Sequence, residues 1–189
     1  MHTMKMMDHI VVHSLQVCRI ALFLSDSLEA DLNPDLIQAA ALLHDITKTR
    51  GIQTHENHAQ TGKQLLIDLG YPEVGDIVGQ HVLLDEYFAP NTPTEAEVVN
   101  YADKRVVHDK VATLTQRTEY IMQRYGIESQ RRKYIHMLGE KTKKLEDHLF
   151  RFCSFSPAEM EALLGPDTCS MEFSGYSGIN NTGKAATGD

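Results

Sequence analysis

Apolar side chains recur along most of the chain with the spacing of helices rather than the alternation of strands. No segment alternates cleanly between apolar and polar side chains with β-branched residues between turns, so strand signals are nearly absent. The pattern predicts helices at residues 7–27, 34–48, 57–69, 72–83, 93–125, 128–150 and 157–164. We therefore expect an all-α domain, a bundle of about six to seven helices.

Capping signals support three of these helix starts. Each combines a polar side chain, which can accept hydrogen bonds from the first backbone N–H groups, with a proline at the first helical position, where its missing N–H has little effect. They are Asn33 with Pro34, the Thr92 and Glu95 capping box, and the Ser156 and Glu159 capping box. Gly70 and Gly165 follow apolar helical segments in the position of a helix C-cap.

Length and composition indicate one globular domain. The chain has 189 residues, of which 42% are hydrophobic and 23% charged, values that fit one domain with a single core. From residue 165 the sequence is rich in Gly, Ser, Thr and Asn and has no helical period. We expect a domain at residues 1–164 and, taken alone, a flexible tail at 165–189.

Charge and apolar patterning limit the classes of partner. A formal net charge of −8 argues against a surface that coats duplex nucleic acid, since duplex binding requires many Lys and Arg side chains. Polar residues interrupt the apolar stretches before the roughly 18 residues that a membrane span needs, and no signal-peptide pattern stands at the N-terminus. Three cysteines without a CxxC pair suit reduced thiols. These features favour a cytoplasmic protein without membrane partners, and they are compatible with a homo-oligomer.

Histidine and aspartate side chains fall at positions that the apolar periodicity directs toward the core. The candidates lie on five successive predicted helices: His13, His44, Asp45, His58, His81 and Asp103. Buried polar groups of this kind need partners, and facing helices of a bundle can bring such side chains together around a metal. Imidazole and carboxylate ligands without thiolate suit iron, manganese, cobalt or nickel better than magnesium, and zinc stays open.

The stretch "ALLHDITK" at residues 41–48 carries the most specific signal. A carboxylate has two oxygens, so Asp45 can bridge two metal ions at the separation of about 3.5 to 4 Å that supports phosphoryl transfer. Lys48 lies four residues after His44 and three after Asp45 on the same helix face, where its ammonium group can meet a phosphate oxygen. Arg105, Lys110 and Arg117 follow Asp103 on one long predicted helix and are candidates to contact distal phosphates.

The order of these residues resembles the HD-domain metal-dependent phosphohydrolases, which are all-α proteins. His13, the His44–Asp45 doublet and Asp103 match the H…HD…D signature, "HDITK" is similar to the HDIGK form of the doublet, and "YADKR" matches the usual surroundings of the last ligand. His58 in "HAQTG" and His81 in "GQHV" match the extra ligands of the binuclear branch. The pattern is most similar to the bacterial symmetrical diadenosine tetraphosphatases, although "KRVVHDKV" replaces their proline-containing segment after Asp103.

The resemblance implies a cofactor of two divalent transition metal ions. His13, His44, Asp45 and Asp103 would hold the first, and Asp45, His58 and His81 the second, with a bridging hydroxide as the nucleophile. Asp45 and Lys48 are then the expected catalytic residues, and Lys48, Arg105 and Lys110 the expected substrate-binding residues. The expected reaction is hydrolysis of a phosphoester or phosphoanhydride in a small phosphorylated, nucleotide-like substrate.

Two alternatives from other functional classes stay open. An HD-type di-iron oxygenase would use the same six ligands in the same order, and Lys48 is the feature that favours hydrolysis over it. A non-catalytic binding or signalling module could retain a metal for structure, but none of the six ligand positions is lost.

Overall fold

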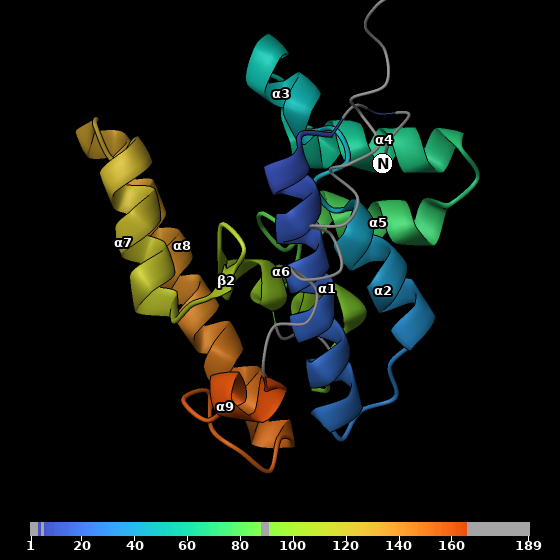
Figure 1. The fold of residues 1–189 in the computed structure, drawn as a ribbon, viewed down its shortest axis with the longest axis vertical. Helices are drawn as coiled ribbons and strands as arrows, with labels where there is room; N and C mark the ends of the chain where they lie inside the picture. Colours follow the sequence, from blue (N-terminus) through green and yellow to red (C-terminus); the bar gives the residue numbers. More distant parts are fainter. Residues whose placement is uncertain (1–3, 5, 88–90, 166–189) are drawn as a thin grey trace, which may run out of the picture.

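Helices dominate the computed structural model, which describes residue 4 and residues 6–87 and 91–165 (Figure 1). The prediction of an all-α fold is confirmed, and the predicted tail lies outside the described residues except for its first residue. In chain order the elements are α1 (Asp8–Ser27), α2 (Pro34–Leu43), α3 (Lys48–Thr54), α4 (His58–Asp68), α5 (Pro72–Gln80), α6 (Glu95–Lys104), β1 (Val106–Val107), β2 (Lys110–Val111), α7 (Leu114–Tyr125), α8 (Ser129–Leu149), the 3-10 helix η2 (Phe150–Phe152) and α9 (Met160–Leu164).

The helix predicted at 34–48 ends early, at Leu43. Asn33 caps its start as expected, its Oδ1 accepting a hydrogen bond from Leu36 N at 3.1 Å. Residues 44–47 form turns, in which Ile46 N donates to Leu43 O and Lys48 N donates to Asp45 O. The chain then enters α3, a separate short helix. The His44–Asp45 doublet therefore lies in a junction between two helices, where both side chains can face the interior.

The prediction of one continuous helix at residues 93–125 is wrong. Two helices, α6 and α7, and the β1–β2 hairpin between them occupy this segment. After α6, Val106 pairs with Val111 and Val107 with Lys110 in an antiparallel register, and His108 in the turn has a φ of +58°. Paired β-branched valines favour such a hairpin over continued helix. Arg105, Lys110 and Arg117 consequently do not share one helix.

The start of α6 also differs from the prediction. Thr94 caps α6 rather than Thr92: its Oγ1 accepts from Glu97 N at 3.3 Å, while Glu97 Oε2 accepts from Thr94 N at 3.1 Å. Glu95 Oε1 instead accepts a hydrogen bond from Asn33 N at 3.0 Å, across to the start of α2. Two overlapping capping-box motifs compete here, and only the tertiary fold selects the second.

The other residues predicted to begin or end helices mostly do so in the structure. Gly70 and Gly165 adopt positive φ values of +89° and +70° after their helices, in the left-handed region that glycine tolerates. Glu159 Oε2 accepts from both Ser156 N at 2.8 Å and Ser156 Oγ at 2.7 Å. This pair closes a turn before α9, which begins only at Met160.

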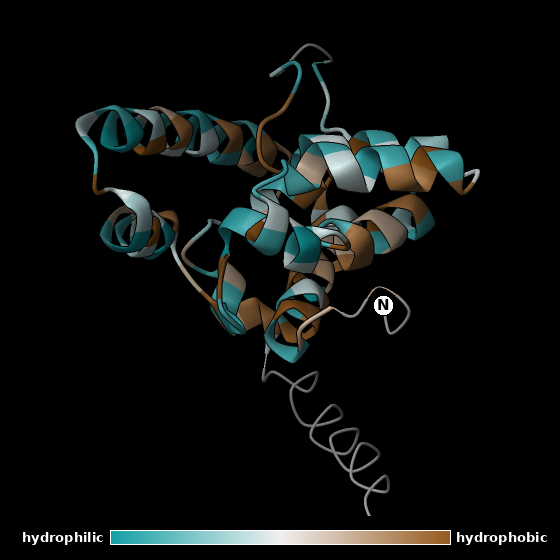
Figure 2. Ribbon diagram, turned by 90° about the horizontal axis from the view of Figure 1, so that it is seen from above, coloured by the Kyte–Doolittle hydropathy of each residue, from teal (hydrophilic) through white to brown (hydrophobic). Residues whose placement is uncertain are grey.

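The core forms around α1, which packs against α2 and α6, while α4 and α5 pack against each other. Hydrophobic residues concentrate on the helix sides that face the interior (Figure 2). Ile20, Leu24, Ile37, Val78 and Val98 are completely or almost completely buried there. Within the described residues, α1 alone is long and apolar enough to cross a membrane by length and composition, in contrast to the expectation from the sequence, and half of that stretch is buried inside this fold.

The helices α7 and α8 pack side by side at one edge of the bundle (Figure 1). The C-terminal part of α8 packs on α6 through a buried polar cluster. There Tyr101 OH donates to Glu146 Oε2 at 2.6 Å, and Arg105 Nη1 lies 3.4 Å from the same oxygen. These contacts fix the C-terminal part of α8 relative to α6, the helix that carries Asp103.

Candidate metal centre

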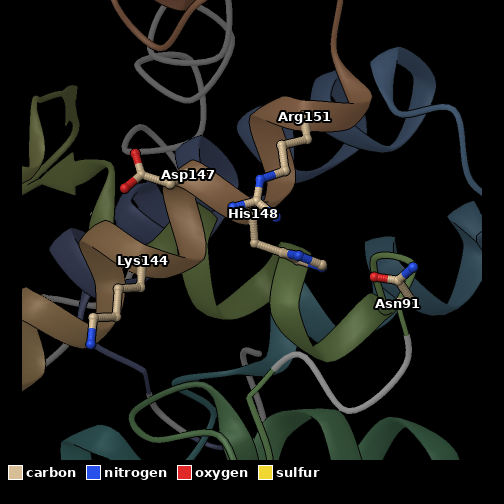
Figure 3. A pocket seen from close by; sticks show the side chains of 5 residues that line it. All are labelled: Asn91, Lys144, Asp147, His148 and Arg151. Carbon is tan, nitrogen blue, oxygen red and sulfur yellow. The ribbon is translucent and has the colours of Figure 1, made fainter.

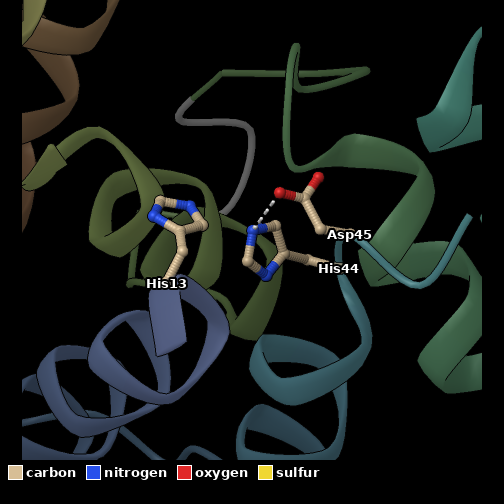
Figure 4. A group of neighbouring side chains, drawn as sticks. All are labelled: His13, His44 and Asp45. Atoms are coloured by element: carbon tan, nitrogen blue, oxygen red, sulfur yellow. Dashed lines mark ion pairs between the residues drawn. The ribbon is translucent and has the colours of Figure 1, made fainter. Parts of the chain in front are cut away.

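The structure brings the six predicted ligand side chains together from separate elements. His13 comes from α1, His44 and Asp45 from the turn after α2, His58 from the start of α4, His81 from the end of α5 and Asp103 from α6. Figure 4 shows His13, His44 and Asp45 facing one another. Two groups have ligand atoms within 4.8 Å of one another: His13, His44 and Asp45 form the first, and Asp45, His58 and His81 form the second. Asp45 belongs to both groups.

Backbone carbonyl groups orient three of the histidines. The Nδ1 atoms of His44 and His81 lie 2.7 Å from the carbonyl oxygens of Ala41 and Val78, three residues earlier in each case. The Nδ1 atom of His13 lies 3.0 Å from the carbonyl oxygen of His108. A carbonyl accepts only from an N–H group, so each Nδ1 carries a proton and each Nε2 is the ring nitrogen that faces the cluster. Metal-binding histidines are commonly held in this way.

His58 enters the cluster from the first residue of α4. Asn57 caps that helix, its Oδ1 accepting from Ala59 N at 3.1 Å. His58 Nε2 then lies 3.2 Å from His81 Nε2 and 3.3 Å from Asp45 Oδ1. Nitrogen lone pairs and a carboxylate oxygen that converge at such distances form a favourable environment for a cation.

Asp45 lies at the centre, and its two oxygens face different partners. Oδ1 is 3.3 Å from His58 Nε2 and 3.6 Å from His81 Nε2. Oδ2 is 3.4 Å from His44 Nε2 and 2.6 Å from Lys48 Nζ. With a side chain only 1% exposed, this carboxylate depends entirely on its neighbours for stabilisation.

Two buried atoms at the centre test whether the residues fit a metal. His44 Nε2 and Asp45 Oδ1 make no hydrogen bond with any of the described residues. An unsatisfied buried polar group destabilises a fold by about 1–3 kcal/mol. An imidazole nitrogen and a carboxylate oxygen are both typical ligand atoms for iron, manganese, cobalt, nickel and zinc. The donor set therefore fits divalent metal ions.

Asp103 closes the cluster on the side of α1. Its Oδ1 lies 3.0 Å from His13 Nε2 and 3.9 Å from His44 Nε2. Two cations accompany it: Lys104 Nζ donates to Oδ2 at 3.0 Å, and Arg117 Nη2 lies 3.5 Å from Oδ1. Lys104 Nζ also donates to the carbonyl oxygen of His81. Sequence reasoning missed Lys104, because adjacency to a ligand does not reveal where a side chain points.

Burial and neighbouring charges set the protonation states of the acidic residues. Burial opposes the charge of both carboxylates, but His44 and Lys48 hold the pKa of Asp45 well below its usual range. Lys104 and Arg117 do the same for the pKa of Asp103. Both residues are therefore ionised at neutral pH, as metal ligands must be.

The histidines differ among themselves. Burial, followed by the neighbouring His81, lowers the pKa of His58 to about 4, and burial lowers the pKa of His81. Burial also opposes the charge of His44, yet the Asp45 carboxylate raises the pKa of His44 above its ordinary value. His58 and His81 are thus neutral at pH 7 and ready to act as ligands.

Lys48 lies beside the cluster, whereas the guanidinium of Arg105 is turned into a buried contact and Lys110 lies on the hairpin. The Lys48 side chain is 35% exposed, so it borders both the cluster and solvent. Arg105 Nε donates to Ala112 O at 2.7 Å, and its guanidinium is occupied within the buried contact between α6 and α8. Lys110 is exposed on β2. The shared helix face on which the sequence placed Arg105 and Lys110 does not form, and the guanidinium of Arg105 is occupied by protein partners. A phosphate contact of Lys110 stays a prediction.

A pocket separate from the cluster lies along α8. It has a volume of about 330 Å³ and is lined by Asn91, Lys144, Asp147, His148 and Arg151. Figure 3 shows the four residues of α8 and η2 across from Asn91. None of them belongs to either group of candidate ligands.

Comparison with protein families gives one result. Residues 10–106, just over half of the chain, match the model of the HD domain. The matched segment contains all six candidate ligands and Lys48, and it ends before α7. No curated protein and no solved structure matches the chain.

Proposed function

Because this chain belongs to the HD domain family, we propose that it is a metal-dependent phosphohydrolase that cleaves a phosphoester or phosphoanhydride of a small, nucleotide-like substrate. The observation that carries the proposal is the pair of ligand groups that share the buried Asp45. The unpartnered His44 Nε2 and Asp45 Oδ1 support metal binding at this point. A cytoplasmic location and the absence of membrane and duplex partners belong to the same proposal, and the charge of −8 supports the absence of duplex partners.

The proposal assigns each ligand to a metal ion. His13, His44, Asp45 and Asp103 would hold one ion, and Asp45, His58 and His81 the other. Two such ions, when bound, supply an activated water and charge stabilisation at the phosphoryl group. The bonds from the histidine Nδ1 atoms to backbone carbonyls keep the ligands oriented while substrate enters and product leaves.

The residues around the ligands are suited to an anionic substrate. Lys48 is close to Asp45 and partly exposed, so its ammonium group can turn from the carboxylate to a phosphate oxygen. Burial disfavours its charge, but the Asp45 carboxylate raises the pKa of Lys48, which keeps it charged. A cation beside the reacting group stabilises the charge that develops during phosphoryl transfer.

The metal count is tested by elemental analysis of protein purified without added chelator or metal. The wild type is compared with His58→Ala, His81→Ala and, as control, His136→Ala, which removes an exposed histidine of α8. We expect two ions per chain in the wild type and in the control, and one in each of the other variants. One ion or none in the wild type would contradict the binuclear assignment.

The reaction is tested on protein reconstituted separately with Mn²⁺, Fe²⁺, Co²⁺ and Ni²⁺. Phosphodiesters, phosphomonoesters and a panel of nucleotides are offered, and oxygen consumption is followed in parallel. Hydrolysis that disappears in the His58→Ala and His81→Ala variants supports the proposal. Failure to hydrolyse any of these substrates overturns it, and oxygen uptake in their place indicates a di-iron oxygenase.

A further inference from the structure

Arg117 reaches the cluster from a part of the chain that the family match does not cover. It lies in the first turns of α7, after residue 106, where the HD domain match ends. Thr113 caps this helix: its Oγ1 accepts from Gln116 N at 3.2 Å, and Gln116 Oε1 accepts from Thr113 N at 2.8 Å. The β1–β2 hairpin reverses the chain just before it, which brings the start of α7 next to Asp103.

The guanidinium of Arg117 has hydrogen-bond donors that the protein does not use. Its only charged contact in the described part of the chain is Asp103 Oδ1, at 3.5 Å, and no described residue accepts a hydrogen bond from it. A guanidinium carries five N–H donors, and a side chain that is 16% exposed places these donors at the border between the cluster and solvent. Arg105 differs, because Ala112, Tyr101 and Glu146 occupy its guanidinium.

The cations pair with different carboxylates of the cluster. Lys48 contacts Asp45, whereas Arg117 contacts Asp103. Lys104 is also beside Asp103, but its ammonium group already donates to that carboxylate and to a backbone carbonyl. Lys48 and Arg117 balance the charge of the two carboxylates, burial lowers the pKa of Lys104, and bound metal ions would add further positive charge. Such a site favours a substrate with several negative charges.

We propose that Arg117 binds a second phosphate group of the substrate, next to the one that Lys48 contacts, so that the enzyme selects phosphoanhydrides over phosphomonoesters. A guanidinium suits this role because its planar fork can donate two parallel hydrogen bonds to one phosphate. The inference rests on the proposed phosphohydrolase function and names the substrate class of the same site.

The test measures equilibrium binding, so that it does not depend on turnover. Methylenediphosphonate and methylphosphonate carry two phosphonate groups and one, and neither contains a hydrolysable anhydride. Their binding to metal-loaded protein is measured by calorimetry with the same excess of metal in cell and syringe. The variants are Arg117→Gln, Arg117→Lys and the control Arg124→Gln. Arg124 lies on α7, and among the described residues its side chain donates to Tyr120 and Tyr125.

We expect Arg117→Gln to weaken methylenediphosphonate binding by about 10- to 100-fold, as loss of a charge-assisted contact predicts. Methylphosphonate binding should change less than about threefold, Arg117→Lys should restore part of the loss, and Arg124→Gln should match the wild type. Metal content, measured on the same samples, should stay the same in all variants.

Several results would overturn the role of Arg117. Arg117→Gln could lose equal affinity for both ligands or no affinity for methylenediphosphonate, and the wild type could bind neither ligand. Loss of metal in Arg117→Gln would show that Arg117 acts through Asp103. Hydrolysis by the wild type together with any of these results contradicts this inference alone. Absence of hydrolysis with the expected binding pattern contradicts the proposed function alone.

Discussion

Replacement of Asp45 by asparagine should separate a shared metal ligand from an ordinary buried carboxylate. The substitution keeps the shape of the side chain and removes its charge. Four side-chain nitrogens lie within 3.6 Å of the two carboxylate oxygens, those of His44, Lys48, His58 and His81. An amide offers one acceptor oxygen, and its NH₂ group cannot bind a cation. At least one of the two ligand groups must therefore lose its carboxylate.

The expected effect on activity is large. If the metal ions stabilise the transition state by about 4 kcal/mol, within the several kcal/mol typical of metal catalysis, their loss slows hydrolysis by about 1000-fold. Metal content should fall from two ions to at most one per chain.

The same substitution should change the free energy of unfolding of the metal-free protein by less than it changes the activation free energy of hydrolysis. Lys48 is 35% exposed and can turn to water, whereas His44 is fully buried and cannot. Loss of one buried partner corresponds to about 1–3 kcal/mol, or a decrease in Tm of roughly 2–12 °C.

The assay combines elemental analysis with thermal unfolding in the presence and absence of a chelator. Added metal should raise the Tm of the wild type by mass action and raise that of Asp45→Asn much less. Asp76→Asn is the matched control, because Asp76 is 60% exposed and pairs with Lys63 on the protein surface. Two metal ions per chain in Asp45→Asn, with the metal-dependent rise in Tm intact, would refute the assignment of Asp45 as the shared ligand.

Three further predictions concern the scaffold. Tyr101→Phe removes the hydroxyl between Arg105 and Glu146 and should destabilise the fold by about 1–3 kcal/mol in urea unfolding with metal content unchanged, so loss of metal would contradict a purely structural role. Gly75→Ala should destabilise the fold by about 1–3 kcal/mol in the same assay, because the new Cβ would lie 2.9 Å from Lys63 O. Gly139→Ala should stabilise α8 by up to about 1 kcal/mol, because its Cβ would meet nothing nearer than 3.5 Å. Equal effects of the two substitutions would refute this reasoning. Burial raises the pKa of the Cys153 thiol to about 11, so its alkylation at pH 8, followed by peptide mass spectrometry, should be about 200-fold slower than in urea, and similar rates would show that the thiol is not shielded.

The chemistry of the site could be read from the sequence because it depends on residue type and order. His13, the His44–Asp45 doublet and Asp103 lie at helical spacings that direct them inward, and the structure brings them together with His58 and His81. The all-α class followed from apolar periodicity, and Asn33 and Gly70 marked helix ends through local chemistry. Each of these signals acts over a few residues, within the range of local pattern reasoning.

The sequence could not show which cationic side chains lie beside the ligands. The sequence offered Arg105, Lys110 and Arg117 as equivalent candidates on one helix, whereas only Arg117 lies beside Asp103. The choice depends on the β1–β2 hairpin, whose valines favour strand pairing once a partner is present. It depends also on Glu146, which lies 41 residues after Arg105 and draws its guanidinium into the contact between α6 and α8.

The sequence by itself thus indicated which side chains can bind metal and that most of the chain is helical, since ligand chemistry and helical periodicity are local properties. The tertiary structure decided where α2 ends before the His44–Asp45 doublet, which capping box forms and which cation faces the site. Those outcomes depend on contacts between residues far apart in the chain, where burial removes water and makes each polar group dependent on the partner that packing provides.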